Sequence, residues 1–185
     1  MKIAVGMTGA SGSIYGLKFL EALKTLNIES HLIVSDAGDK VAKYELGFGK
    51  EELNTYAGHH HEIGSIDSPL ASGSFGIDSM AVIPCSMNTL GCIASGISLN
   101  LIHRCANVII KEEKKLILVL RETPYSPIDI DNMQKLSKIG VTILPASPAF
   151  YHNPKSIDDL VNHIVGKTLD ILKIKNNLFK RWGVK

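Results

Sequence analysis

The chain has 185 residues, of which 45% are hydrophobic, so it is long and apolar enough to bury one full core. No shift in composition divides it, and we expect a single domain over residues 1–185. Twenty basic and eighteen acidic residues leave a formal net charge of +2. This balance gives no reason to expect nucleic acid or an anionic membrane as a partner.

The three cysteines, Cys85, Cys92 and Cys105, have neither the number nor the spacing of a disulfide framework or a zinc knuckle. Their presence fits a reducing compartment. The chain opens on a strand-like segment without a secretory leader, and it has no apolar run of about 18 residues that could span a bilayer. We therefore expect a soluble, cytoplasmic protein.

Strand and helix patterns alternate along the chain. The apolar spacing predicts strands at 2–6, 31–35, 80–84, 116–120 and 141–144, and helices at 14–26, 38–44, 89–96, 101–108, 129–139 and 157–172. Ser156 is the expected N-cap of the last helix. Residues 47–74 have weak periodicity and indicate an irregular segment with at most one short helix. The alternation predicts an α/β fold, a parallel sheet with helices on both faces, because parallel strands require crossover helices.

A glycine-rich turn, Gly6-Met-Thr-Gly9-Ala-Ser11-Gly12, joins the first strand to the first helix. Its backbone N–H groups and the positive end of the helix favour a phosphate or a flavin. The spacing differs from the dinucleotide fingerprint, which needs glycine at Met7, and from the phosphate loop, which needs Gly-Lys-Ser/Thr at residues 12–14. Taken alone, the turn is equally consistent with a tight strand-to-helix connection.

The residues that follow the predicted strands are the ones to examine for chemistry, because ligands of such sheets bind outside the carboxyl ends of the strands. Hydroxyl, amide and guanidinium groups gathered there suit the phosphate and the flat ring of flavin mononucleotide (FMN). Strand ends are also polar in many proteins simply because they face solvent. The residues concerned are Thr8, Ser11, Gly12, Ser35, Asp36, Cys85, Ser86, Thr89, Arg121, Glu122, Pro148, Phe150 and Tyr151.

Eight motifs occur in chain order: Thr8-Gly-Ala-Ser11-Gly, Ser72-Gly-Ser-Phe75, Pro84-Cys-Ser86-x-x-Thr89, Asn100-Leu-Ile-x-Arg104, Lys111-Glu112, Arg121-Glu122-Thr-Pro124, Asn132-Met133 and Pro148-Ala-Phe-Tyr151. Together they resemble the motifs of the UbiX-type flavin prenyltransferases, and the resemblance runs from about residue 2 to Trp182. The resemblance implies a Rossmann-like flavoprotein fold and a homododecamer. The implied reaction joins a dimethylallyl group from dimethylallyl monophosphate to N5 and C6 of reduced FMN, without a metal, and the product serves a partner UbiD-type decarboxylase.

The resemblance also implies which residues bind the two substrates. FMN is assigned Gly9, Ala10, Ser11, Ser35, Ser86, Met87, Asn88, Thr89 and Arg121. The dimethylallyl phosphate is assigned Arg104, Lys111, Tyr151 and Lys167. Lys167 departs from relatives that carry arginine, although lysine can still bind a phosphate as a point charge.

Four residues are assigned to catalysis by the same resemblance: Ser11, Glu45, Lys111 and Glu122. Ser11 and Glu122 would assist around N5, while Glu45 would lie at the dimethylallyl site, where a neighbouring subunit could contribute it. Without the motif, Glu122 would be read as half of a surface ion pair with Arg121, and Glu45 as a solvated helix end.

No metal site is expected. The acidic pair Asp158-Asp159 falls in the first turn of the last helix, where carboxylates favourably meet the helix dipole. The run His59-His60-His61 cannot direct all three rings at one ion from a helix or a strand, and no cysteine or carboxylate stands at ligand spacing. Cys85 is expected to be a small buried hydrophobe rather than a nucleophile.

Two rival functions remain open. An FMN-dependent decarboxylase of cysteine-containing substrates would share the fold and use a histidine base such as His60 or His61. Those enzymes have a Pro-x-Met-Asn segment, whereas this chain reads Pro84-Cys-Ser-Met-Asn88. A non-catalytic flavin carrier would keep the FMN residues and lose the phosphate residues, yet both sets are present. A nicotinamide oxidoreductase is disfavoured by the spacing of the glycine turn.

Overall fold

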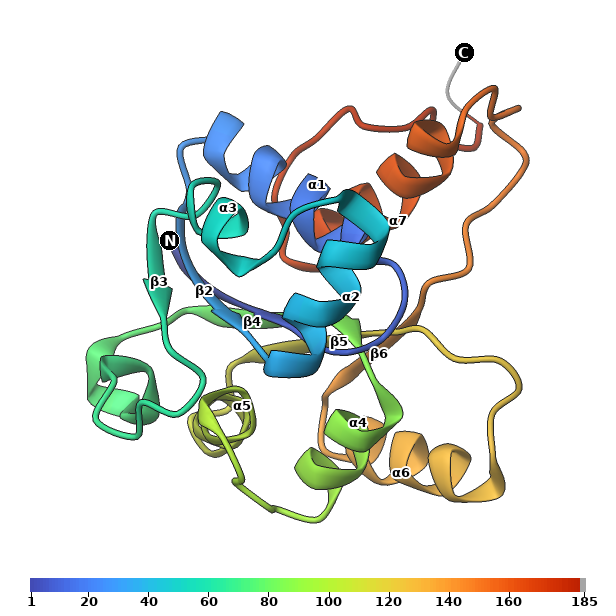
Figure 1. Ribbon diagram of the computed structural model, residues 1–185. Helices are drawn as coiled ribbons and strands as arrows, with labels where there is room; N and C mark the ends of the chain where they lie inside the picture. Colours follow the sequence, from blue (N-terminus) through green and yellow to red (C-terminus); the bar gives the residue numbers. More distant parts are fainter. Residues whose placement is uncertain (184–185) are drawn as a thin grey trace.

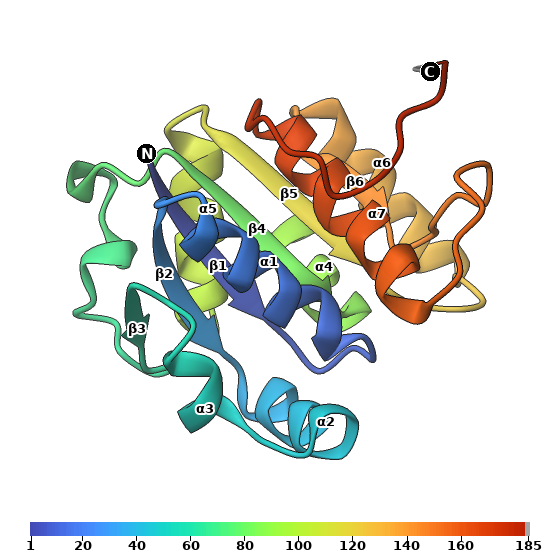
Figure 2. The ribbon, with the colours of Figure 1, turned by 90° about the horizontal axis from the view of Figure 1, so that it is seen from above.

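The computed structural model describes residues 1–183, which are built around one six-stranded sheet (Figures 1 and 2). Every neighbouring pair of strands is parallel. The strand order β3-β2-β1-β4-β5-β6 reverses between β1 and β4, so the predicted α/β fold is confirmed. The strands are β1 (Lys2–Met7), β2 (Glu29–Val34), β3 (His59–His61), β4 (Ser79–Cys85), β5 (Lys115–Leu120) and β6 (Thr142–Pro145).

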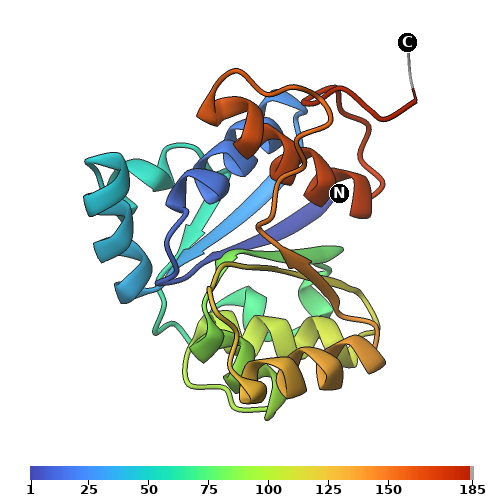
Figure 3. The same cartoon turned by 90° about the vertical axis from the view of Figure 1, so that its right-hand side faces the viewer.

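Helices cover both faces of the sheet, and each face has its own core (Figure 3). On one side α1 and α7 pack on the sheet, while α4, α5 and α6 pack on the other. The helix α2 stands at the carboxyl ends of β1 and β2 (Figure 2). The helices are α1 (Ser13–Thr25), α2 (Asp36–Leu46), α3 (Lys50–Asn54), α4 (Met87–Ala94), α5 (Leu101–Lys111), α6 (Pro127–Lys138) and α7 (Ile157–Ile171).

The central strands are buried on both sides, which explains their nearly continuous apolar sequences. Each residue of β4 is buried, as are the last five of β5. Strands covered by helices on both faces lack the alternation of half-exposed strands. None of the helices in residues 1–183 combines the length and the apolar character needed to cross a membrane.

N-cap side chains bond to the first turns of five helices: α2, α4, α5, α6 and α7. The Ser156 hydroxyl accepts from the backbone N–H of Asp159, and the Asp159 carboxylate accepts in return from the N–H of Ser156. This capping box confirms the predicted N-cap of α7. Asp158 and Asp159 thus occupy the first turn of a helix, as expected.

The segment predicted to be irregular contains a strand that the sequence did not indicate. Its one short helix, α3, agrees with the prediction, but β3 follows and adds to the open edge of the sheet. Two short 3₁₀ helices, η1 (Pro69–Ala71) and η2 (Gly73–Phe75), complete the segment. Three consecutive histidines carry no apolar alternation, so this strand is defined by its pairing with β2 and not by its own pattern.

Candidate active site

A cavity of about 560 Å³ opens at the carboxyl edge of the sheet, where the strand order reverses between β1 and β4. Its volume falls within the roughly 300–1,000 Å³ typical of small-molecule and cofactor sites. The walls come from the segments that follow β1, β2, β3 and β4 and from the start of α5. They are formed by Thr8, Gly9, Ser35, Asp36, Ala37, Ile63, Gly64, Ser86, Asn88, Thr89, Leu99, Asn100 and His103.

The Thr8 hydroxyl ties the ends of β1 and β4 together beneath this cavity. It donates to the carbonyl of Pro84 at 2.9 Å and accepts from the backbone N–H of Ser86 at 2.8 Å. Only 3% of Thr8 is exposed. Without the hydroxyl the Ser86 N–H would lose this acceptor, and the Pro84 carbonyl would keep only its bond from the Thr8 N–H at 3.2 Å, so Thr8 fixes the position of the segment that begins α4.

Three helix N-termini converge on the cavity, those of α2, α4 and α5. Their N-caps, Ser35, Ser86 and Asn100, each accept a hydrogen bond from a backbone N–H in the first turn. Helix N-termini carry partial positive charge and further unsatisfied N–H groups. The hydroxyl of Thr89 lies 3.2 Å from that of Ser86. The cavity therefore offers a phosphate several donors without any cationic side chain in its wall.

Gly9 is needed for the close approach of the first turn to α2. A Cβ at this position would lie 2.5 Å from the Cβ of Ala37. Any larger residue would push the turn away from the N-terminus of α2. The glycine thus keeps the first turn and the N-terminus of α2 next to each other.

The Glu45 side chain meets the end of the glycine-rich turn. The Glu45 carboxylate accepts from the backbone N–H of Gly12 at 2.9 Å and from that of Ser13 at 2.7 Å. Glu45 therefore caps α1 from the end of α2 and takes the place where an anion was expected. Glu45 is therefore not simply a solvated helix end. Its carboxylate also lies beside the Ser11 side chain.

This setting governs the ionisation of Glu45. Burial raises the pKa of its carboxyl, but hydrogen bonds from Ser11, Ser13 and Gly12 together outweigh burial and hold the pKa below its ordinary value. Glu45 is therefore ionised at neutral pH. A carboxylate next to the Ser11 hydroxyl can orient that hydroxyl and accept its proton.

His103 is a cavity residue that the sequence analysis missed. Its side chain is buried, and neither ring nitrogen has a hydrogen-bond partner within residues 1–183. Burial lowers its pKa, so the ring is neutral and offers one donor and one acceptor. A buried, unpartnered imidazole in a cavity wall fits a polar ligand. The sequence contained one sign of this role. His103 lies three residues after the N-cap Asn100, in the first turn of α5, and that turn faces the strand ends.

The structure brings five of the predicted FMN residues together in the cavity wall: Gly9, Ser35, Ser86, Asn88 and Thr89. Met87 opens instead into a neighbouring hollow between α4 and α6. Ala10, Ser11 and Arg121 lie outside the wall. Arg121 stands near Tyr15, where burial raises the pKa of the phenol and the guanidinium charge partly lowers it.

The four residues predicted to bind the dimethylallyl phosphate do not lie together within one chain. Arg104 and Lys111 belong to α5, where Arg104 Nε donates to the carbonyl of Ala71 at 3.1 Å and Lys111 Nζ pairs with Glu112 at 2.9 Å. Lys167 lies on α7, on the opposite face of the sheet (Figure 3). Tyr151 contacts the α7 residue His163 edge to face. The sheet thus separates the two pairs.

Two further sequence expectations can be compared with the geometry. Glu122 forms no ion pair with Arg121; its carboxylate accepts from the backbone N–H of Thr123 at 3.0 Å. Cys85 is fully buried, and burial raises the pKa of its thiol far above the ordinary value. It is therefore a protonated core residue and not a nucleophile.

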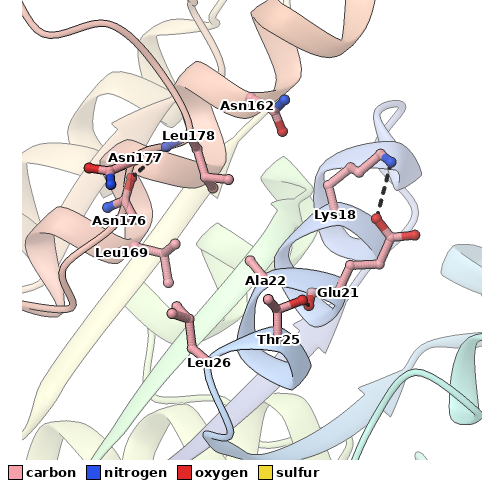
Figure 4. Close-up of a pocket in the computed structure, with 10 residues that line it drawn as sticks. All are labelled: Lys18, Glu21, Ala22, Thr25, Leu26, Asn162, Leu169, Asn176, Asn177 and Leu178. Carbon is pink, nitrogen blue, oxygen red and sulfur yellow. Dashed lines mark hydrogen bonds and ion pairs between the residues drawn. The ribbon is translucent and has the colours of Figure 1, made fainter.

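A second hollow, of about 260 Å³, lies between the later half of α1 and the segment around α7 (Figure 4). Its rim carries the ion pair of Lys18 with Glu21 at 3.0 Å, and apolar side chains such as Leu169 and Leu178 face it. None of the predicted site residues lines it. The cavity at the strand reversal is therefore the candidate site.

The fold and this cavity define a flavoprotein, and the flavoprotein family model matches residues 1–169. The flavin prenyltransferase UbiX of Methanocaldococcus jannaschii is 48% identical over 99% of both chains. The structure resembles that of AnUbiX in complex with FMN and dimethylallyl pyrophosphate, with a TM-score of 0.97, 42% identity, and coverage of 100% of this chain and 98% of the other. A dodecameric, FMN-dependent UbiX-like decarboxylase from Escherichia coli also has a TM-score of 0.97, with 39% identity and full coverage of both chains.

The chain belongs to the UbiX family of flavin prenyltransferases. It is accordingly an enzyme of the transferase class.

Proposed function

We propose that the protein joins the dimethylallyl group of a dimethylallyl phosphate to N5 and C6 of reduced FMN and releases the phosphate. The observation that carries this proposal is the convergence of Gly9, Ser35, Ser86, Asn88 and Thr89 on one cavity at the strand reversal. The structural likeness to AnUbiX, which was crystallised with FMN and dimethylallyl pyrophosphate, supports it.

The cavity suggests how FMN lies. Its phosphate would bind where α2, α4 and α5 begin, with the hydroxyls of Ser35, Ser86 and Thr89 as side-chain donors. The ring would extend toward Ser11 and Arg121 on the α1 side. Reduced FMN, when bound, supplies the two nucleophilic positions N5 and C6.

Cleavage of the allylic C–O bond sends its electron pair out with the phosphate. The developing charge needs preorganised donors, which we assign to the cations of Arg104, Lys111 and Lys167 and to the Tyr151 hydroxyl. Formation of the N5 bond releases one proton. Ring closure at C6 removes a second proton there and adds one to the alkene. Ser11 with the ionised Glu45, and Glu122, are the groups that would handle these protons.

A complete phosphate pocket requires more than one chain, because the sheet separates Arg104 and Lys111 from Tyr151 and Lys167. We propose that it forms between subunits of a homododecamer, as the dodecameric relative suggests. We also propose that a UbiD-type decarboxylase consumes the prenylated flavin.

The test is an anaerobic incubation of the purified protein with reduced FMN and a dimethylallyl donor, followed by mass spectrometry of the extracted flavin. Parallel reactions with the monophosphate and the pyrophosphate identify the donor. We expect a flavin heavier by one dimethylallyl group less one hydrogen. Unmodified FMN recovered from a fully assembled protein with both donors would contradict the proposal.

A further inference from the structure

The open edge of the sheet carries four potential metal ligands on one face. Glu29 and His31 are two residues apart in β2, and His59 and His61 are two residues apart in β3. Side chains alternate along a strand, so each pair points to the same side. The register pairs His31 with His59 directly. His60 points to the other side.

These side chains are close enough to share one ion. The Nε2 atom of His31 lies 3.0 Å from Glu29 Oε1, and that of His59 lies 3.6 Å from the same oxygen. One ligand atom from each of the three residues lies within 4.8 Å of the others. A tetrahedral site with bonds of about 2.1 Å needs ligand atoms about 3.4 Å apart, so the stacked rings of His31 and His59 must rotate to direct their nitrogens at one ion.

We propose that Glu29, His31 and His59 bind one divalent cation of the Zn²⁺ class. Two imidazoles and a carboxylate are ligands that Zn²⁺ and its first-row neighbours accept, and a fourth position would face solvent. His59 and Glu29 are partly exposed, with 56% and 37% of their side chains accessible, so an ion can enter. His31, with 3% of its side chain exposed, forms the floor.

A chain of hydrogen bonds supports the buried ligand. His31 Nδ1 lies 3.1 Å from His61 Nε2, and His61 Nδ1 lies 3.0 Å from the Ser68 hydroxyl. With an ion on Nε2, His31 carries its proton on Nδ1 and donates it to His61. A metal-bound histidine whose other nitrogen donates to a fixed acceptor is the usual outer-shell arrangement.

Aromatic contacts surround the buried ligand. Phe75 packs edge to face on His31 at 5.3 Å. His59 stacks on His31 with ring centroids 4.6 Å apart, so the two proposed histidine ligands lie against each other.

The ammonium group of Lys2 lies near the proposed site and would repel a metal ion there. Lys2 Nζ lies 3.6 Å from Glu29 Oε1 and 4.8 Å from the centroid of the Phe75 ring. Its side chain is 38% exposed, so it can turn into solvent when a metal takes the carboxylate. Removing this charge should strengthen metal binding.

The histidine run alone does not supply this site, and His60, its middle member, points to the other side of the strand. The other ligands come from β2, about thirty residues earlier, and only strand pairing brings them together. This site is separate from the flavin cavity. Glu29 begins β2, while Ser35 follows its end, about 20 Å away at the rise of an extended strand.

The test measures Co²⁺ and Zn²⁺ binding by the full-length assembled protein after chelator treatment. Co²⁺ absorption reports the geometry, and calorimetry with Zn²⁺ reports affinity and stoichiometry. We expect one ion per chain. His59→Ala should weaken binding about tenfold or more, in line with what ligand-sphere substitutions cost. His60→Ala, the matched control on the other face, should leave it unchanged, and Lys2→Ala should tighten it.

A second measurement guards against a folding artefact. Zn²⁺ should raise the melting temperature of the wild type and of His60→Ala, but not that of His59→Ala, because the ion binds only the folded site. Absence of Co²⁺ or Zn²⁺ binding would overturn the proposal. Equal losses in His59→Ala and His60→Ala would do the same, since they would indicate nonspecific binding by surface histidines.

Discussion

The two predicted substrate sites differ in how one chain builds them. Five FMN residues meet in a single cavity, because they follow neighbouring parallel strands that end at the same edge. The phosphate-donor residues lie on helix α5 and around helix α7, on opposite faces of the sheet. A site made from strand ends is completed by the fold itself. Under the proposed function, the donor site on the two helix surfaces is completed by a neighbouring chain.

The largest expected effect is a loss of turnover without a loss of FMN binding, which would distinguish the dimethylallyl phosphate site from the flavin site. Lys111→Ala and Tyr151→Phe should each lower turnover by about 10²–10³-fold, as loss of one preorganised donor does. FMN binding, measured by fluorescence titration, should remain at the wild-type level. Lys138→Ala, which removes an exposed cation from α6, is the control. Joint loss of FMN binding and turnover would place Lys111 or Tyr151 in the flavin site.

Mixing these two variants tests whether the donor pocket is shared between chains. Co-assembly of Lys111→Ala and Tyr151→Phe chains in equal amounts should restore activity in about a quarter of the pockets, because random pairing leaves that share intact. The measurement is turnover after denaturation and joint refolding. Separately refolded variants are the control. No recovery in verified mixed assemblies would show that both residues act within one chain.

Loss of the Thr8 hydroxyl should destabilise the segment that begins α4 and thereby weaken FMN binding. Thr8→Val removes one of the two hydrogen bonds to the Pro84 carbonyl and takes the acceptor from the Ser86 N–H, which should cost about 1–3 kcal/mol in the free energy of unfolding. FMN affinity should fall as well, because Ser86 shifts. Thr168→Val is the matched control. That hydroxyl is fully buried and bonds to Ile164 within α7, so its loss should reduce stability without affecting FMN.

The smallest expected effect concerns the Glu45 cap. Glu45→Gln should lower stability by about 0.5–2 kcal/mol at neutral pH, as the loss of a helix cap does. The pKa of Glu45 is lowered on folding, so its contribution is present above the ordinary value of 4.5 and is lost as the pH falls through the folded value.

Melting temperatures of the wild type and Glu45→Gln should therefore converge in acid. Asp131→Asn, an exposed carboxylate change on α6, should show no such convergence. A constant difference between Glu45→Gln and wild type at all pH values would mean that the charge of Glu45 is not responsible.

The sequence by itself determined the features that depend on short-range pattern. The buried strands β1, β4 and β5, the Ser156 cap and the order of polar residues after each strand could be read directly, since periodicity and capping are local. The family motifs, which the sequence analysis used to predict the substrates, are local for the same reason, because each occupies a few consecutive residues.

Only the tertiary structure decided the rest. β3 exists because β2 offers it an edge, Glu45 caps α1 from thirty-three residues away, and His103 faces the cavity because α5 begins there. The division of the phosphate-donor residues between two faces, and the grouping of His59 with Glu29 and His31, likewise follow from packing. Such contacts join residues distant in the chain, and local pattern carries no record of which distant partner a side chain will meet.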